Sequence, residues 1–251
     1  MSLKVCTWNV WFDHIHQEER INNAMKELQT QMPEIICLQE VTTPILRFVF
    51  NHPICVDYNV LHDQYSTESY GEVFLLRRDR PVTNFYSIPF RDSNMGRRIY
   101  VLDTEMCQTR VRVINVHLES EFSGHPKGIK AQQLDQLLKF AWGANESYRR
   151  VIIAGDTNLT DRDDRAWAVD LLKRVDCIDL KPVTTVPIYT YDCKRNTNVL
   201  GKFQSRLDRF ICRSGTVCQE YKLLGTTPFR AKNGEAVFPS DHFGVCISIS
   251  L

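Results

Sequence analysis

Apolar residues gather in short runs along the chain, and polar or turn-forming residues separate these runs. Runs rich in Val, Ile and Leu with such boundaries are typical of β-strands. We expect strands at residues 3–8, 34–38, 73–76, 99–102, 111–116, 151–154, 206–211 and 244–249.

Three longer segments place their apolar residues at helical spacing. In residues 17–32, Ile21, Ala24, Met25 and Leu28 share one face, and Pro33 ends the run. Residues 127–142 and 162–174 predict two further helices. Many strands with so few helices predict an α/β sandwich of two packed sheets flanked by helices. The alternation is too irregular for a closed eight-fold barrel, and without a linker or repeat we expect one domain over residues 1–251.

The composition predicts a folded protein, and its balanced charge disfavours a DNA-coating role while being neutral about an enzyme. Hydrophobic residues make up 43% of the 251, which is enough for a sizeable core. The 31 basic and 30 acidic residues leave a net charge of +1, so any contact with phosphates must depend on locally placed arginines. We expect a monomer.

The cysteines and the apolar runs indicate in which kind of cellular compartment the protein works. None of the nine cysteines forms a Cys-x-x-Cys pair, and Cys6, Cys37 and Cys246 lie in strand-like runs, where we expect free thiols that pack as small apolar residues. No apolar run approaches the length of a membrane span and no signal-peptide pattern is present. We therefore expect a reducing compartment and no membrane association.

Polar residues follow or precede several of the predicted strands directly. Asn9, Glu40, His117 and Asp156 come just after strand-like runs, and Asp241-His242 come just before the last one. Together with Asn158, these side chains are those of a metal-assisted phosphoryl-transfer site. Mg²⁺ prefers oxygen ligands and takes one or two protein carboxylates, a requirement that Glu40 and Asp241 meet. Alternatively, Glu40 caps a helix that begins near Thr42, or pairs with a surface arginine.

The remaining polar groups suit the other parts of such a site. Asp156 and Asn158 can orient an attacking water and donate to the phosphorus species, although Gly-Asp-Thr-Asn is also typical of a simple polar turn. His117 and His242 can donate to phosphoryl oxygens, or serve a structural role. Arg97, which neighbours Arg98, can bind phosphate through two parallel hydrogen bonds or lie on a solvated face.

The order of these motifs and the residues within them resemble those of the endonuclease/exonuclease/phosphatase superfamily, and most closely those of its 5′-tyrosyl-DNA phosphodiesterases. The resemblance covers residues 4–250. It is carried by Thr7-Trp8-Asn9, Leu38-Gln39-Glu40-Val41, Met95-Gly96-Arg97, His117-Leu118-Glu119-Ser120, Gly155-Asp156-Thr157-Asn158-Leu159, Tyr189-Thr190-Tyr191-Asp192, Arg206-Leu207-Asp208-Arg209 and Ser240-Asp241-His242-Phe243.

The resemblance implies a four-layer α/β sandwich with mixed sheets and Mg²⁺-dependent hydrolysis (Mn²⁺ can substitute) of the phosphodiester that links a DNA 5′ end to a trapped topoisomerase II tyrosine, leaving a 5′-phosphate. It implies metal ligation by Glu40 and Asp241 and catalytic roles for Asn9, His117, Asp156, Asn158 and His242. It also implies that single-stranded or overhanging DNA ends are bound through Arg97, Ser120, Tyr191, Arg206 and Leu207, and that the protein works in the nucleus and also the cytoplasm.

At three positions the residue differs from the one that is frequent in the family, and each of these positions is expected to affect DNA binding. Leu207 replaces a frequent aromatic residue, Thr160 a common Arg, and Tyr191 a frequent Trp, although Tyr keeps a stacking face. These changes leave open another nuclease of the superfamily, an abasic-site endonuclease or a poly(A) deadenylase. A non-catalytic binding module is a third hypothesis, which the complete set of catalytic side chains disfavours.

Overall fold

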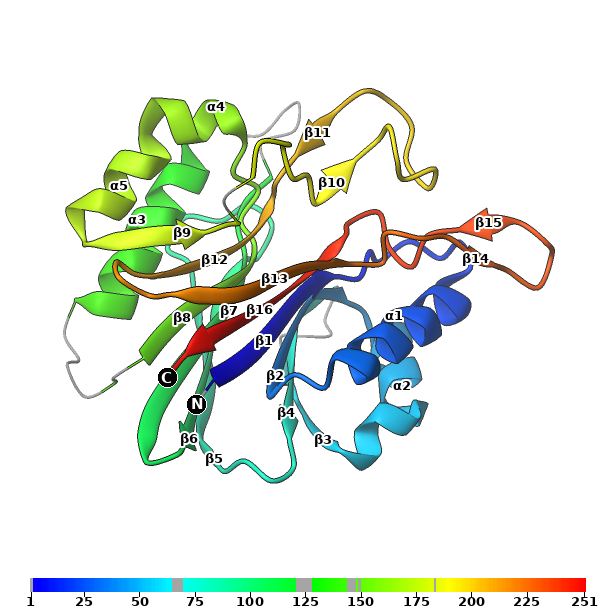
Figure 1. Cartoon of the computed structure of the whole chain (residues 1–251), viewed down its shortest axis with the longest axis horizontal. Helices are drawn as coiled ribbons and strands as arrows, with labels where there is room; N and C mark the ends of the chain where they lie inside the picture. Colours follow the sequence, from blue (N-terminus) through cyan, green and yellow to red (C-terminus); the bar gives the residue numbers. More distant parts are fainter. Residues whose placement is uncertain (1, 65–69, 121–127, 144–147, 149, 183) are drawn as a thin grey trace.

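The computed structural model describes residues 2–64, 70–120, 128–143, 148, 150–182 and 184–251. Two six-stranded mixed sheets form the centre of the molecule (Figure 1). The first sheet has, in order, β13 (Cys218–Leu224), β16 (Gly244–Ser250), β1 (Ser2–Asn9), β2 (Ile35–Val41), β4 (Gly71–Arg77) and β3 (Tyr58–Leu61). The second has β5 (Val82–Pro89), β6 (Arg98–Met106), β7 (Thr109–His117), β8 (Arg150–Asp156), β12 (Asp208–Arg213) and β9 (Cys177–Leu180).

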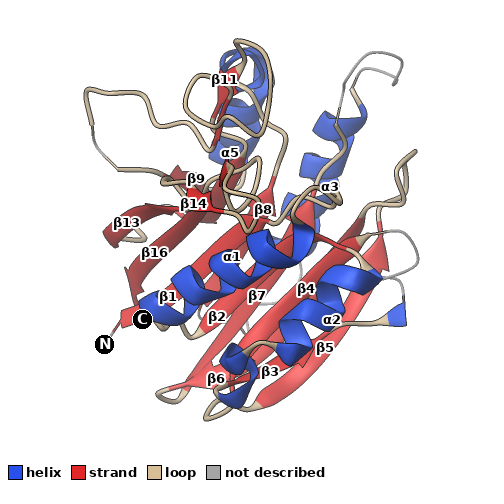
Figure 2. Cartoon of the chain, turned by 90° about the vertical axis from the view of Figure 1, so that its right-hand side faces the viewer, coloured by secondary structure: helices blue, strands red, loops and turns tan. Residues whose placement is uncertain are grey.

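Helices cover the outer face of each sheet (Figure 2). On the first sheet lie α1 (Gln17–Gln31), α2 (Thr43–Asn51) and the 3₁₀ turn η1 (Pro53–Val56). On the second lie α3 (Ile129–Trp142), the π turn η3 (Asp164–Ala168) and α5 (Val169–Arg174), with α4 (Asp161–Asp163) before η3. The four-layer α/β sandwich expected from the sequence is therefore confirmed. The expected start of the second helix, at Lys127, lies outside the described residues.

Three apolar cores hold these four layers together. The middle core lies between the sheets and includes Leu3, Phe74, Leu102 and Phe210, all fully buried. The outer cores lie under the helices, where Ile21 and Leu28 of α1, for example, are also fully buried. Burial of such side chains stabilises the fold by about 1.5–3 kcal/mol each. The helical spacing in residues 17–32 thus reflects real packing.

Two short hairpins and one disulfide complete the fold. The hairpins are β10 (Tyr191–Asp192) with β11 (Gln204–Ser205), and β14 (Phe229–Arg230) with β15 (Ala236–Val237). Cys6 and Cys246 face each other on β1 and β16 and form a disulfide, whereas we expected two free thiols. Strand pairing places these two residues, which are 240 positions apart, within reach of each other, with Cα atoms 4.1 Å apart. No described helix is long and apolar enough to span a bilayer.

Candidate active site

Strand pairing gathers the polar strand ends at one edge of the sandwich. Because β1 runs parallel to β2 and β7 runs parallel to β8, the residues that end these four strands lie at the same edge. Antiparallel β12 and β16 begin where their neighbours end, which adds Asp208 and the Asp241-His242 pair. Asn9 joins the two sheets there, since its Nδ2 donates to Glu40 Oε1 at 3.0 Å and to Asp156 Oδ2 at 3.1 Å.

The backbone is strained at this edge. Glu40 and Asn158 adopt left-handed conformations with φ of +62° and +52°, which are uncommon outside glycine and are often found at functional sites. The Asn158 N–H donates to Asp156 Oδ1 at 2.9 Å, so residues 156–158 do form a polar turn. Asn158 Nδ2 donates to Leu118 O at 3.0 Å, which fixes its side chain beside the end of β7. The polar turn is thus present, and the catalytic role of the two side chains stays a prediction. Glu40 does not cap the next helix, because Thr42 does.

Asp156 is the most crowded acceptor of the cluster. Its Oδ2 accepts from Asn9 and lies 3.2 Å from His117 Nε2 and 3.7 Å from His242 Nε2. Burial by itself raises the pKa of Asp156, but the charges of His117 and His242 and the hydrogen bonds of His117 and Asn158 outweigh it. The pKa of this carboxyl therefore lies well below its usual range. The carboxylate is therefore ionised, and an ionised carboxylate can accept a hydrogen bond from a water molecule.

Asp208 is a member of the site that the sequence analysis did not assign. It is fully buried, and its Oδ2 lies 2.8 Å from His242 Nδ1. Burial opposes the charged imidazole, yet Asp208, Asp241 and Asp156 raise the pKa of His242 well above its usual value. His242 is thereby held as a donor whose Nε2 faces Asp156. The available signal was the position of Asp208 at the start of a predicted strand, within the Arg-Leu-Asp-Arg motif.

His117 and Arg97 form the opposite wall of the cluster. Arg97 is buried, and its Nη1 and Nη2 lie 2.9 Å from His117 Nδ1 and 3.2 Å from His117 Nε2. The same Nε2 lies 3.2 Å from Asp156 Oδ2. The Arg97 guanidinium also lies over the Tyr70 ring, 5.2 Å from its centroid. The interpretation of Arg97 as part of a solvated face is therefore wrong.

Glu40 and Asp241 have the properties of a metal site. The Asp241 carboxylate accepts from Ser240 Oγ at 3.3 Å and from no other described donor. Burial, together with the charges of Glu40 and Asp156 and against that of His242, raises the pKa of Asp241 to about 7. A divalent cation would relieve this crowding of carboxylates and find the oxygen ligands that Mg²⁺ prefers. The two residues predicted as ligands therefore fit the ion.

Among the described residues, Asp156, Asp208 and His242 form a group of possible ligands whose ligand atoms lie within 4.8 Å of one another. Its atoms are already committed, however, because His242 Nδ1 binds Asp208 and both oxygens of Asp156 accept hydrogen bonds. N–H donors that occupy these oxygens compete with a cation for the same lone pairs. Glu40 likewise accepts two N–H donors, Asn9 Nδ2 on Oε1 and the Phe12 N–H on Oε2, so these hydrogen bonds do not separate the two groups. Asp241, which accepts only from Ser240 among the described donors and whose pKa is raised, is the carboxylate best placed to gain from a cation.

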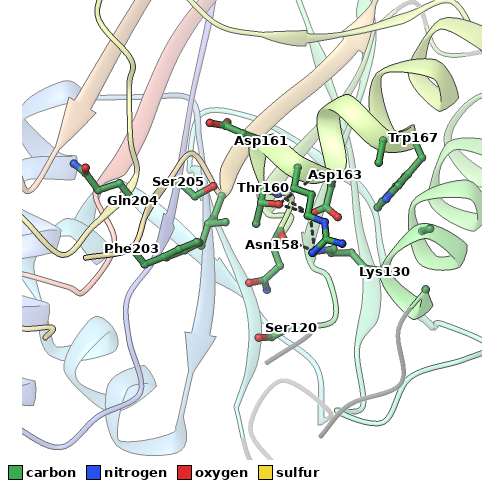
Figure 3. Close-up of a pocket in the computed structure, with 15 residues that line it drawn as sticks. Ser120, Lys130, Asn158, Thr160, Asp161, Asp163, Trp167, Phe203, Gln204 and Ser205 are labelled. Carbon is green, nitrogen blue, oxygen red and sulfur yellow. Dashed lines mark hydrogen bonds and ion pairs between the residues drawn. The ribbon is translucent and has the colours of Figure 1, made fainter. Parts of the chain in front are cut away.

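A pocket of about 710 Å³ opens beside the cluster (Figure 3). Ser120, Asn158 and Leu207 are among the residues that line it, and Phe203 and Trp167 lie on opposite sides of Asn158 in Figure 3. Tyr191 lies nearby, its ring edge-on to His242 with centroids 5.1 Å apart. The structure thus brings Ser120, Tyr191 and Leu207 to the site.

Arg206 lies away from the site, although we expected it to bind substrate. Its guanidinium is buried and forms two hydrogen bonds with Asp179. Asp179 also pairs with Arg209, which donates to Leu159 O at 2.8 Å. A guanidinium held by a buried carboxylate is not free to bind phosphate. Arg206 is therefore held by Asp179, the same carboxylate that pairs with Arg209.

The chain belongs to the Endonuclease/Exonuclease/phosphatase family, because the model of that family matches residues 6–242. It is similar to tyrosyl-DNA phosphodiesterase 2 of Xenopus laevis, with 28% identity over 95% of this chain and 64% of the relative. It is similar also to the Homo sapiens protein of that name, with 26% identity over 98% of this chain and 67% of the relative. The chain thus spans about two thirds of the length of these relatives.

A solved structure confirms the fold. The D. rerio TDP2 complexed with single-strand DNA product superimposes with a TM-score of 0.85 and 22% sequence identity, over 100% of this chain and 99% of the other. The resemblance predicted from the motifs is therefore confirmed. The enzyme class expected from it, a hydrolase acting on phosphodiester bonds, is the one that the names of these relatives state.

Proposed function

We propose that the protein is a Mg²⁺-dependent phosphodiesterase that hydrolyses the 5′-phosphotyrosyl bond between DNA and a trapped topoisomerase II tyrosine, leaving a 5′-phosphate. One observation carries the proposal above all. A buried Asp156 with a low pKa, ringed by donors, lies beside two carboxylates suited to a metal, Glu40 and Asp241. Such a site can orient a water against phosphorus while positive charge collects on the phosphoryl oxygens.

The chain's own residues account for the binding and orientation steps. Asp156 accepts a hydrogen bond from the attacking water, and Asn9 and the Asn158 N–H hold that carboxylate in place. His242, oriented by Asp208, donates to a non-bridging oxygen, and His117 does so from the opposite wall. Preorganised donors of this kind lower the barrier because charge develops where they already point.

A magnesium ion held by Glu40 and Asp241 would supply positive charge to the phosphoryl group, and Mn²⁺ can replace it. The proposed substrate suits a site with these two carboxylates. Its leaving group is a phenol with a pKa of about 10, which departs more easily than an alkoxide. Because this positive charge would be lost with the ion, metal removal is expected to abolish turnover.

The pocket beside the cluster supports a nucleic-acid strand as substrate. Phe203 and Trp167 offer aromatic faces on which bases can stack, and Ser120 and Asn158 lie where the pocket meets the catalytic residues. The relatives named tyrosyl-DNA phosphodiesterase 2 support the same class of substrate. We propose that DNA 5′ ends, single-stranded or overhanging, are the partners of a monomer that acts in the nucleus and also the cytoplasm.

A substrate panel tests this proposal. A 5′-phosphotyrosyl single-stranded oligonucleotide, an abasic duplex and a poly(A) strand would each be incubated with Mg²⁺ or with EDTA. We expect Mg²⁺-dependent release of a 5′-phosphate end from the first substrate only. Glu40→Ala should abolish this release, while Glu105→Ala, a change at an exposed glutamate on β6, should leave it intact.

The other outcomes separate the alternatives. Cleavage of the abasic duplex or of poly(A) in place of the tyrosyl substrate would assign the same site to an abasic-site endonuclease or a deadenylase. Inactivity on all three substrates, by a protein that remains folded, would contradict the proposed enzyme.

A further inference from the structure

Glu119 is a buried carboxylate to which the proposed reaction assigns no role. It follows β7 directly, between Leu118 and Ser120, and its side chain is fully buried. Three donors converge on it: Ser93 Oγ at 2.9 Å, the Asn94 N–H at 2.9 Å and Gln133 Nε2 at 3.1 Å. Since all three partners donate, the site requires a group that only accepts, which an ionised glutamate is.

These donors belong to the segment that leads to Arg97. Ser93 and Asn94 lie between β5 and β6, and Ser93 Oγ, while donating to Glu119, accepts from the Arg97 N–H at 2.8 Å. Gln133 of α3 accepts from the Glu119 N–H at 2.7 Å and donates to Asp92 O at 3.1 Å. Glu119 therefore ties the segment before Arg97 both to the end of β7 and to α3.

The network continues from Arg97 to the centre of the site. The Arg97 guanidinium contacts both ring nitrogens of His117, Nδ1 at 2.9 Å and Nε2 at 3.2 Å, and His117 Nε2 lies 3.2 Å from Asp156 Oδ2. Among the described residues, Arg97 Nε has no partner although it is buried. A guanidinium aimed in this way gains from being fixed before substrate arrives, because a misplacement of about 1 Å can cost a hundredfold in rate.

We infer that Glu119 is a positioning residue that sets the place of Arg97, and through it of His117, by holding Ser93 and Asn94. The inference rests on the proposed function, in which Arg97 and His117 line the phosphoryl group. Glutamine cannot replace Glu119, because its amide nitrogen would meet a donor in place of an acceptor. The segment would then shift to avoid that contact, and Arg97 would move with it.

A double-mutant cycle tests the coupling. Glu119→Gln should lower kcat/KM on the 5′-phosphotyrosyl oligonucleotide by about tenfold or more. In the Arg97→Met background the same change should lower it less than about threefold, because Arg97 is no longer there to be misplaced. The Mg²⁺ concentration for half-maximal rate should not change. Equal effects of Glu119→Gln in both backgrounds would overturn the inference.

Matched variants separate positioning from loss of stability. Asp103→Asn removes another buried carboxylate, one that pairs with Arg112 at 2.7 Å far from the cluster, and its effect should be the same with and without Arg97. Ser93→Ala breaks the same link more gently and should couple to Arg97 as Glu119→Gln does. Ser93→Ala also serves if Glu119→Gln does not fold.

Amide hydrogen exchange provides a readout that does not depend on activity. In Glu119→Gln and Ser93→Ala, the amides of residues 94–98 should exchange faster than in the unmodified protein, and those in Asp103→Asn should not. Unchanged exchange at these amides would overturn the inference even in a protein inactive on tyrosyl-DNA. Inactivity of the unmodified protein combined with faster exchange would count against the proposed function alone.

Discussion

The substitution Arg20→Met tests how the loop that follows Asn9 is joined to the loop that precedes Asp241, one of the two proposed metal ligands. Arg20 lies on α1 and is fully buried, and burial lowers its pKa to about 10, so it stays charged at neutral pH. Its guanidinium donates to five backbone carbonyls at 2.5–3.4 Å, those of Val10, Trp11, Asp13, Ile15 and Pro239. It thereby joins the loop after Asn9 to the loop before Asp241.

The cost of this substitution follows from which carbonyls lose their donor. Water can reach the partly exposed carbonyls of Trp11, Asp13 and Ile15, whereas the bonds to Val10 and Pro239 are buried. An unsatisfied buried acceptor costs about 1–3 kcal/mol, so two of them cost about 2–6 kcal/mol. Total stability is about 5–15 kcal/mol, and about 3 kcal/mol corresponds to a fall in Tm of about 6–12 °C in a chain of this size.

Two measurements separate a local effect from a general one. Thermal unfolding gives the change in Tm, and the free-ion signal in electron paramagnetic resonance gives the affinity for Mn²⁺. Arg20→Met should lower Tm as above and weaken Mn²⁺ binding by about tenfold, because the loop that carries Asp241 is no longer held. Arg112→Met, which removes a buried arginine paired with Asp103, should lower Tm but leave Mn²⁺ binding unchanged. Equal Mn²⁺ affinities in the two variants would refute the reasoning.

Three further outcomes are expected. Asp208→Asn should lower kcat by about tenfold to a hundredfold, because His242 Nδ1 loses its anionic partner at 2.8 Å, and steady-state rates near those of the unmodified protein would contradict this. Gly155→Ala should destabilise the fold by about 3 kcal/mol or more in urea titrations, because its Cβ would lie 1.9 Å from Val116 O at a φ of +143°; an unchanged midpoint would count against it. Burial raises the pKa of Glu72 to about 8, against the charge of Arg97, so the free energy of unfolding should fall as pH rises from about 4.5 to about 8. Glu72→Gln should flatten this profile, and identical profiles for both proteins would exclude the effect.

The sequence predicted the buried strands and missed the exposed ones. Continuous apolar runs such as those of β2 and β8 mark strands covered on both faces, so they stand out from their surroundings. The edge strand β13, with sequence Cys-Gln-Glu-Tyr-Lys-Leu-Leu, is largely exposed and lacks that signal. Hairpin β10–β11 has two residues per strand and depends on contacts that no local pattern records.

In the site, too, features marked by the local sequence could be predicted, whereas contacts between distant residues could not. Asn9, Glu40, Asp156 and Asp241 could be predicted because each directly follows or precedes an apolar run. The hydrogen bond between Asp208 and His242 joins residues 34 positions apart, and nothing local indicates it. The expectation for Arg206 was wrong because its partner, Asp179, comes from a different strand.

The most direct test of the account is single-turnover hydrolysis of a 5′-phosphotyrosyl oligonucleotide with Mg²⁺ by the unmodified protein and by Asp156→Asn. The asparagine keeps the size of Asp156 but lacks the charge that holds the water between His117 and His242. The account predicts a 5′-phosphate product from the unmodified protein and a rate lower by at least about a hundredfold in the variant, with its fold intact by circular dichroism. An Asp156→Asn variant that retains most of the rate would contradict it.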